Sequence, residues 1–222
     1  MEGPGQILVM GAALGFLAWT LMHRNDATDA ETGETDNSAD VLDLGYQVID
    51  YGSAIFDESN DMTAQANLSA FLAAIRPGEG TSSANGYSIL CGGGTFDDYS
   101  AHPALAGWRG WQMPLDMARK AGYPNGAVST AAGAFQINRP TYKRLADKLG
   151  LDDFSPNTQD RMAIELIREK GALGDVLAGR AEAAAGKVAK VWASMPGATY
   201  GQRTVSMQSF LNQYSQAGGQ FA

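Results

Sequence analysis

The chain has very few of the residues that most often bind metals or form disulfides. Its 222 residues include one cysteine, Cys91, and two histidines, His23 and His102. A single cysteine excludes an internal disulfide, and a lone thiol is more often a small buried hydrophobe than a nucleophile. No group of His, Cys, Asp and Glu has the spacing of a metal site. The sequence therefore predicts neither a metal ion nor a cofactor.

Basic residues are also scarce, and they are unevenly distributed. The net charge is −8, and eleven acidic residues but no Lys or Arg lie between Asn25 and Thr63. With Glu2 and Arg24 added, residues 1–63 sum to −11, which leaves +3 for residues 64–222. No long Lys/Arg run and no aromatic-basic RNA motif is present, which argues against a nucleic-acid partner. A mildly basic domain behind an acidic stem is attracted weakly to anionic surfaces such as bacterial cell wall.

One long apolar run stands at the N-terminus. Residues 3–22 carry no charge, and ILVMGAALGFLAWTLM is almost wholly apolar. Twenty helical residues span about 30 Å, the hydrocarbon thickness of a bilayer. A secretory signal would start with basic residues, whereas this chain starts with MEGPGQ. We expect residues 1–24 to form a transmembrane segment that enters a lipid membrane through residues 5–22, in an orientation left open; a buried core helix is the alternative.

Residues 25–62 are predicted to form an acidic flexible linker. The first part, NDATDAETGETDNSAD, is too polar to bury a core. In VLDLGYQVIDYGSAIF (residues 41–56), apolar residues return near helical spacing at Val41, Leu44, Val48 and Ile55. This stretch is predicted to be a short helix that packs on the domain, with docking on the membrane as the alternative.

Residues 63–222 are predicted to form one compact α+β domain. Leu68, Phe71, Leu72 and Ile75 have the i, i+3, i+4, i+7 spacing of an amphipathic helix, which Pro77 and Gly78 disturb or end. Asn85-Gly86, the Tyr87–Leu90 run and the glycines at 92–94 suggest a short β-hairpin. Pro140 with a Gly150 cap marks a helix at 140–149, and a Ser155 cap with Pro156 and Gly171 marks one at 156–170. Two more helices fit 181–194 and 204–217.

The stretch RPGEGT at 76–81 places Glu79 between two glycines at the end of the first of these helices. A carboxylate held against apolar residues is partly desolvated, which favours its neutral form and raises its pKa. Cleavage of a glycosidic bond needs such an acid, because the leaving oxygen must receive a proton. A solvated glutamate beside a turn is the alternative that the stretch alone leaves open.

Six blocks of sequence carry a resemblance to a known family. They are EGT at 79–81, a glycine- and aromatic-rich block at 92–103, STAAGAFQI at 129–137, LGLDDFSPNTQD at 149–160, EKGAL at 169–173 and WASMPGATYGQ at 192–202. In this order the blocks resemble the lambda-type phage endolysins and cover nearly all of residues 66–219. The resemblance implies a lysozyme-like fold and a lytic transglycosylase that acts on peptidoglycan. The first 63 residues have no part in it.

The resemblance also implies a set of site residues. The family's catalytic glutamate falls on Glu79. The hairpin that roofs such sites, the Gly-x-x-Gln block and the ATYGQ block supply the substrate-binding candidates, which are Tyr87, Ser88, Asp98, Gly133, Phe135, Gln136 and Tyr200. Asp98 is alternatively no more than a turn former.

Two features depart from the family pattern. Ser88 stands where the family often has an acidic residue, so a candidate second carboxylate is missing. A lytic transglycosylase tolerates this, because one residue can act as acid and then as base. The segment between His102 and Ser129 is also longer than expected. Its tryptophans and basic residues either stack on sugars or pack on the domain; they are Trp108, Arg109, Trp111, Arg119 and Lys120.

The expected function is cleavage of the β-1,4 bond between N-acetylmuramic acid and N-acetylglucosamine with formation of a 1,6-anhydro ring. A hydrolytic lysozyme and a non-catalytic glycan-binding virion protein are the alternatives. Because the membrane segment lacks a basic N-terminal flank, we favour a virion-associated enzyme that aids genome entry. A late lysis enzyme in the host inner membrane, with its domain in the periplasm, is the other expectation. Other virion proteins are further expected partners.

Overall fold

The computed structural model describes residues 58–120, 122–198 and 204–222. The predicted membrane segment, the linker up to residue 57 and Tyr200 lie outside these ranges. In the part described, none of the helices combines the length and apolar character that a bilayer span requires. The helices are α3 (Glu58–Glu79), α4 (Leu115–Lys120), α5 (Arg139–Leu149), α6 (Pro156–Glu169), α7 (Leu173–Leu177), α8 (Ala181–Val188) and α9 (Met207–Gln216), with a 3₁₀ turn at Gly86–Ser88.

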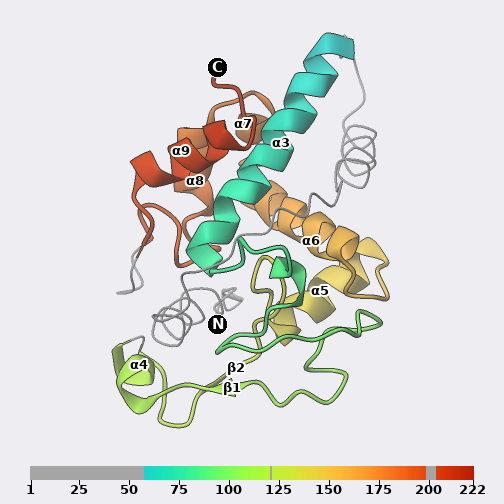
Figure 1. The fold of residues 1–222 in the computed structure, drawn as a ribbon, viewed down its shortest axis with the longest axis vertical. Coiled ribbons are helices and arrows are strands. Elements are labelled where there is room, and N and C mark those ends of the chain that lie inside the picture. The colour runs from blue at the N-terminus through green and yellow to red at the C-terminus, as the bar shows by residue number, and fades with distance from the viewer. Residues whose placement is uncertain (1–57, 121, 199–203) are drawn as a thin grey trace, which may run out of the picture.

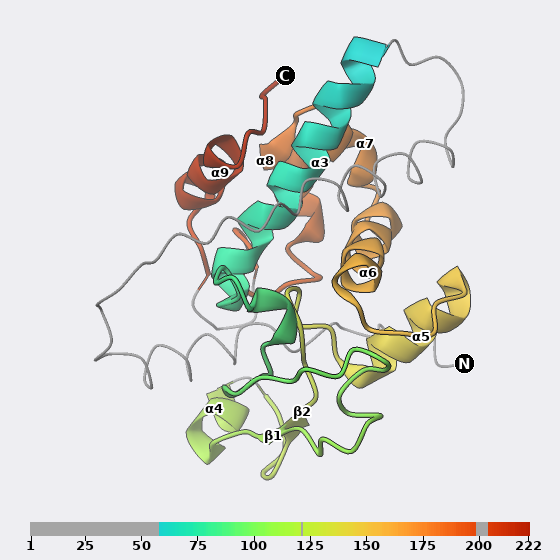
Figure 2. The same ribbon diagram turned by 45° about the vertical axis from the view of Figure 1, so that its right-hand side comes forward.

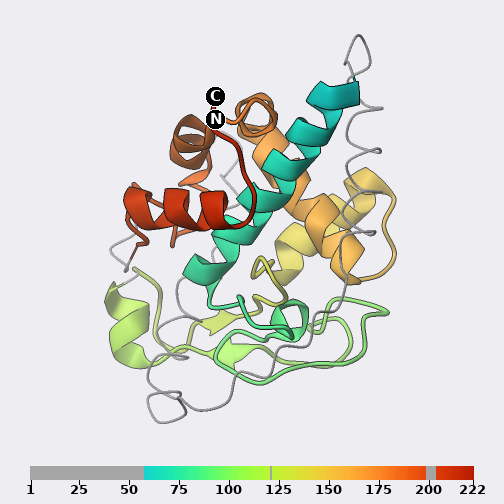
Figure 3. The same cartoon turned by 45° about the horizontal axis from the view of Figure 1, so that its top comes forward.

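Helix α3 runs through the middle of the domain. In Figure 1, α7, α8 and α9 lie on one side of it, α5 and α6 on the other, and α4 with the two strands beyond its C-terminal end. The view in Figure 3 keeps this arrangement. The predicted apolar face is confirmed, since Leu68, Phe71, Leu72 and Ile75 are buried. The Phe71 ring meets Phe210 of α9 edge-on, with ring centroids 5.2 Å apart.

The end of α3 differs slightly from the prediction. Pro77 lies inside the helix, which continues to Glu79. Gly80 then adopts a φ of 72°, the left-handed conformation typical of the residue after a helix. The Arg76 guanidinium donates to the backbone oxygen of Thr81 from Nε (3.0 Å) and Nη2 (2.8 Å) and so fastens the departing chain. Glu79 is therefore the last helical residue, fixed by the turn that follows it.

The small sheet lies in a different place from the predicted hairpin. Between Ile89 and Thr95 there is a single antiparallel bridge rather than two strands, because Gly92, Gly93 and Gly94 all take positive φ and turn the chain at once. The two-stranded sheet is instead β1 (Trp111–Gln112) against β2 (Val128–Ser129). The prediction of a small β element within a mostly helical domain is confirmed, whereas the strands at 87–94 are wrong.

The capping predictions are confirmed for α5 and α6. Gly150 ends α5 with φ 63°, and the Ser155 side chain accepts a hydrogen bond from the backbone N–H of Thr158 at the start of α6. Helix α8 is shorter than the predicted 181–194. The chain leaves it at Val188, whose carbonyl accepts from the backbone N–H of Val191 (2.7 Å), and this turn directs the Trp192 side chain into the core.

The long segment after His102 forms a small second core against the domain. Trp108 and Trp111 pack with Met117 and Tyr123 around the buried residues Cys91, Met113, Ala118 and Ala131. A Cβ on Gly92 would lie 2.1 Å from the indole of Trp111, so only glycine allows this contact. The two tryptophans are thus half-buried packing residues.

Candidate active site

Glu79 is buried, with one carboxyl oxygen hydrogen-bonded and the other without a hydrogen-bond partner among the described residues. Its side chain is 2% exposed. The Ser194 hydroxyl donates a hydrogen bond to Oε1, while Oε2 has no hydrogen-bond partner among the described residues. Ser194 approaches closely because residue 78 is glycine, where a Cβ would lie 2.7 Å from the Ser194 Oγ. The carboxyl group is therefore oriented through Oε1, and the buried Oε2 is left to accept or donate a hydrogen bond.

Burial decides the protonation state of this carboxyl. It raises the pKa of Glu79 to about 8, against an opposing effect of the Ser194 hydrogen bond. Because a group with a pKa of about 8 is mostly protonated at pH 7, Glu79 rests as a neutral acid. It has the protonation state that proton donation to a leaving oxygen requires.

Other titratable groups near the site are unsuited to proton transfer or nucleophilic attack. Burial raises the pKa of the Cys91 thiol to about 12, so it stays protonated and unreactive. His102 is fully buried, and burial lowers its pKa to about 4. Its Nδ1 accepts from the backbone N–H of Ala104 (3.2 Å), which leaves Nε2 to donate to the Ile137 carbonyl (2.9 Å). Both ring nitrogens are thus engaged in the framework.

A strained loop at Gly133–Gln136 is tied to the glutamate by Thr81. The buried Thr81 hydroxyl donates to the carbonyl of Ala134 (2.6 Å), so the EGT and GAFQ blocks are in direct contact. Gln136 has a φ of 47°, unlike every other non-glycine residue among those described. Its Nε2 donates to the carbonyl of Gly133 (3.0 Å), and its buried Oε1 has no hydrogen-bond partner in the described part of the chain. Backbone strain with an unsatisfied polar atom is typical of functional loops.

Gln159 holds this loop in place, although the sequence analysis did not single it out. Its Oε1 accepts from the backbone N–H of Ala134 (2.8 Å), and its Nε2 donates to the carbonyls of Tyr87 (3.0 Å) and Phe154 (2.9 Å). A Cβ on Gly133 (φ 76°) would lie 2.0 Å from Gln159 Oε1. A fully buried amide thus joins three segments, and the only sequence signal was its place in the LGLDDFSPNTQD block.

The family model named Endolysin matches residues 69–221, well over half of the chain. The chain belongs to the endolysin family. Two curated endolysins are similar to it. That of Escherichia phage P2 is 38% identical over 163 residues, 69% of this chain and 93% of that protein. That of Escherichia phage lambda is 34% identical over 156 residues, 68% of this chain and 90% of that protein.

Two solved structures share the fold of this endolysin. The lysozyme of bacteriophage lambda in complex with a chitohexasaccharide matches with a TM-score of 0.60 and 30% sequence identity. That match covers 77% of this chain and all of the other. A second structure of the lysozyme from bacteriophage lambda matches with a TM-score of 0.58 at the same identity and coverage. The expected family and lysozyme-like fold are therefore confirmed.

In this endolysin, the two aromatic site candidates among the described residues, Tyr87 and Phe135, are engaged in the framework. The Tyr87 hydroxyl donates to Asp160 Oδ1 (2.9 Å), and the Arg76 guanidinium lies over its ring, 5.1 Å from the centroid. Phe135 is fully buried, and its carbonyl accepts a hydrogen bond from the Trp192 indole (3.1 Å). Of the two residues, only the partly exposed ring of Tyr87 reaches the surface.

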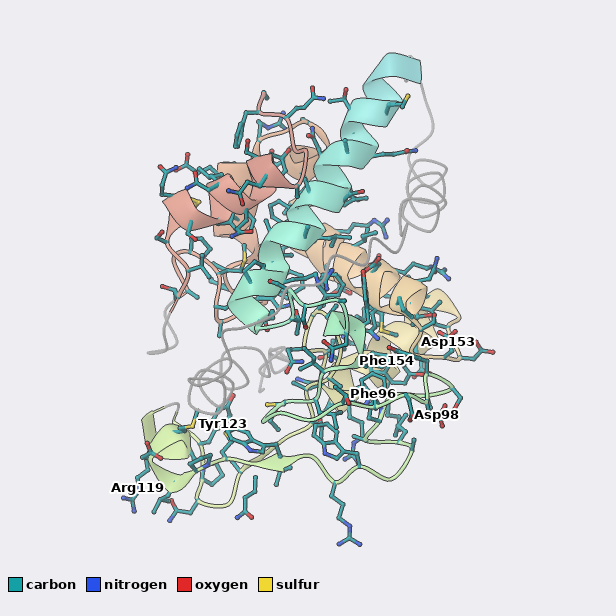
Figure 4. The ribbon with its side chains drawn as sticks, viewed as in Figure 1. Phe96, Asp98, Arg119, Tyr123, Asp153 and Phe154 are labelled. Carbon is teal, nitrogen blue, oxygen red and sulfur yellow. The ribbon has the colours of Figure 1, made fainter. Side chains whose placement is uncertain are left out.

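The remaining candidates of the endolysin lie at its surface. The Ser88 hydroxyl donates to the carbonyl of Asn85 (3.0 Å). Asp98 is exposed, and hydrogen bonds from Ser100 lower its pKa, as expected for the turn-forming alternative. In Figure 4, Asp98 points outward on the same side as Asp153, away from Arg119 and Tyr123 of the α4 region. The structure thus brings Glu79, Gly133 and Gln136 together and places Asp98 at the outer edge.

Proposed function

We propose that this endolysin is a lytic transglycosylase that cleaves the bond between N-acetylmuramic acid and N-acetylglucosamine with Glu79 as acid and then base. Endolysins cleave peptidoglycan, so the family itself supplies the substrate class. The similar lambda lysozyme was solved with a chitohexasaccharide, which has the β-1,4 linkage of the peptidoglycan backbone. The observation that supports the proposal best is the buried, neutral Glu79, whose Oε2 has no hydrogen-bond partner among the described residues.

The first step uses the proton on Glu79. Because Ser194 holds Oε1, Oε2 donates this proton to the glycosidic oxygen as the bond to muramic acid C1 breaks. The N-acetylglucosamine alcohol leaves, and positive charge develops at C1. Glu79 is now a carboxylate in an apolar setting, where the charged form is disfavoured, so it recovers a proton readily.

The second step returns that proton. The C6 hydroxyl of the same muramic acid attacks C1, and the Glu79 carboxylate takes the hydroxyl proton. A 1,6-anhydro ring closes, and the enzyme is regenerated in its protonated state. Intramolecular attack benefits from a high effective molarity, so a second activating group is not required.

The buried carboxylates favour this single-acid chemistry. Among the described residues the buried acids are Glu79, Asp160 and Glu165. Asp160 accepts hydrogen bonds from Tyr87, and Glu165 pairs with Lys148 (2.7 Å). Ordinary glycosidases need a second free carboxylate about 5–5.5 Å (retaining) or 6.5–9.5 Å (inverting) from the acid. Since the other two buried acids are engaged elsewhere, Glu79 is proposed to act alone.

Mass spectrometry of digested peptidoglycan tests the mechanism. We expect muropeptides that end in 1,6-anhydro-muramic acid, 18 Da lighter than the hydrolysed products because no water is added. Products with reducing ends would identify a hydrolytic lysozyme. Binding to insoluble peptidoglycan without cleavage would identify a glycan-binding virion protein instead.

For the setting of the enzyme, we propose that residues 5–22 anchor the chain in a lipid membrane of the virion, where the domain opens the wall for genome entry. The support is the uncharged apolar run without a basic N-terminal flank. Immunoblots of purified virions and of host membranes at late infection separate this role from host lysis. Detection in host membranes alone would refute the virion assignment.

A further inference from the structure

A groove lies at the end of the domain remote from Glu79. It has a volume of about 380 Å³ and is bordered by the N-terminal half of α3, by α7 and by the C-terminal tail. Figure 2 shows α7 and the chain end near this half of α3, with the β1–β2 sheet at the other end of the helix. Ala64, Ala178 and Phe221 are among the residues that border the groove.

The walls of this groove are fixed by hydrogen bonds. The buried Asn67 side chain donates from Nδ2 to the carbonyl of Leu177 (3.2 Å) and accepts at Oδ1 from the backbone N–H of Gln220 (2.7 Å). The backbone N–H of Ala222 donates to the carbonyl of Gly179 (3.3 Å). One side chain of α3 thus ties α7 and the tail together, so the groove is formed before anything binds.

The groove is bordered by apolar side chains such as Leu177 and Phe221 together with uncharged polar ones, which are Thr63, Asn67 and Gln220. None of the residues that border it carries a charged side chain. Phe221, which borders the groove, is 55% exposed. An exposed aromatic side chain beside an apolar groove is typical of an interaction surface. The chemistry fits an apolar segment of polypeptide.

We propose that residues 41–56 of this chain occupy the groove. The segment ends two residues before Glu58, where α3 begins. Ala64 lies about 9 Å along the helix from that point, a distance that three extended residues cover. Val48 and Ile55 supply apolar side chains, and the two charged residues of the segment, Asp43 and Asp50, fall on the opposite face at helical spacing. A covalently attached segment also reaches an effective concentration in the millimolar range, so a weak contact suffices.

Cysteine labelling in the full-length chain tests this docking. Cys91 is 1% exposed and its thiol pKa is about 12, so the native cysteine does not react with the label in the folded chain. Ala178→Cys places a thiol in the exposed part of the groove, and Ala183→Cys places a matched thiol on the exposed face of α8. Each is reacted with a maleimide in detergent, in the native chain and in the double variant Val48→Asp/Ile55→Asp.

Docking predicts that the double variant increases the labelling rate of Ala178→Cys at least tenfold and leaves that of Ala183→Cys unchanged. Equal rates at Ala178→Cys in both chains would overturn the proposal. Protection that disappears on dilution would also overturn it, in favour of a second copy of the chain in the groove. If the aspartates unfold the protein, the buried Cys91 becomes reactive, and Val48→Ser/Ile55→Ser replaces the double variant under the same criteria. Because Glu79 takes no part, the result is independent of the proposed reaction.

Discussion

The Glu79→Gln substitution replaces a buried acid by a neutral amide of similar shape. Gln neither donates an acidic proton nor takes one back, so both proposed steps lose their proton carrier. A single general acid–base role is worth roughly 10²–10⁴-fold in rate. If Glu79 performs both steps, the loss in kcat exceeds this range, while the variant still binds insoluble peptidoglycan in a pull-down assay.

The same substitution has a calculable effect on stability. The pKa of Glu79 is about 8 in the folded domain against 4.5 for an exposed glutamate. Below pH 4.5 the Glu79 carboxyl is neutral in the folded and the unfolded state, so its burial does not reduce the free energy of unfolding. As the pH rises from 4.5 to 8, the unfolded chain ionises first and the free energy of unfolding falls by about 1.4 kcal/mol for each pH unit. The cost is about 3 kcal/mol at pH 7 and approaches about 5 kcal/mol above pH 8.

Urea unfolding at several pH values measures this cost. The unfolding free energy of Glu79→Gln does not show this pH-dependent loss. The difference in unfolding free energy between the variant and the parent chain therefore increases from pH 5 to pH 8. Glu182→Gln, at an exposed position of α8, is the matched control and leaves both activity and this pH dependence unchanged. Retention of most activity by Glu79→Gln would refute the assignment of the acid. Parallel stability curves would refute the desolvation argument.

Three further substitutions test the surroundings of Glu79. Ser194→Ala removes the hydrogen bond that lowers the pKa of Glu79, so the alkaline limb of the pH–rate profile moves to higher pH; an unmoved limb contradicts the contact. Gln136→Ala lowers kcat/KM by about tenfold or more through loss of the proposed Oε1 contact to sugar. It also lowers the unfolding free energy by about 1–2 kcal/mol, because the Nε2 hydrogen bonds to the carbonyls of Ile89 and Gly133 are lost. Unchanged kinetics would remove Gln136 from the site. The Cβ of Gly133→Ala would collide with Gln159, so the unfolding free energy measured in urea titrations falls by about 3 kcal/mol or more. An unchanged unfolding free energy would contradict this steric argument.

The sequence predicted the helices best where local signals are strong. The apolar face of α3 and the caps at Ser155 and Gly150 depend on neighbouring residues only, and the structure confirms them. The predicted hairpin strands at 87–94 were wrong, because a turn signal indicates a chain reversal but not how far the flanking strands extend. The end of α3 was displaced because the Arg76 contact to Thr81 outweighs the tendency of Pro77 to stop a helix.

The site itself was only partly accessible from sequence. The local sequence does not show whether a glutamate beside glycines is buried. Glu79 was identified from the family resemblance rather than from the spacing of residues. Its partner Ser194 lies 115 residues away and belonged to a block noted only for its similarity. Gln159 was missed because an amide inside a helix has no pattern that reveals three buried hydrogen bonds.

Helix α3 connects the two ends of the domain that the proposals concern. Its N-terminal half borders the groove, and its last residue is the acid, about 20 Å away along the axis. A segment seated in the groove would lie toward the end of α3 opposite Glu79. If that geometry serves an anchored enzyme, lengthening the linker within residues 25–40 changes activity on intact cell walls but not on soluble glycan fragments. Equal activity of the lengthened and native chains on both substrates would show that the orientation of the domain is immaterial.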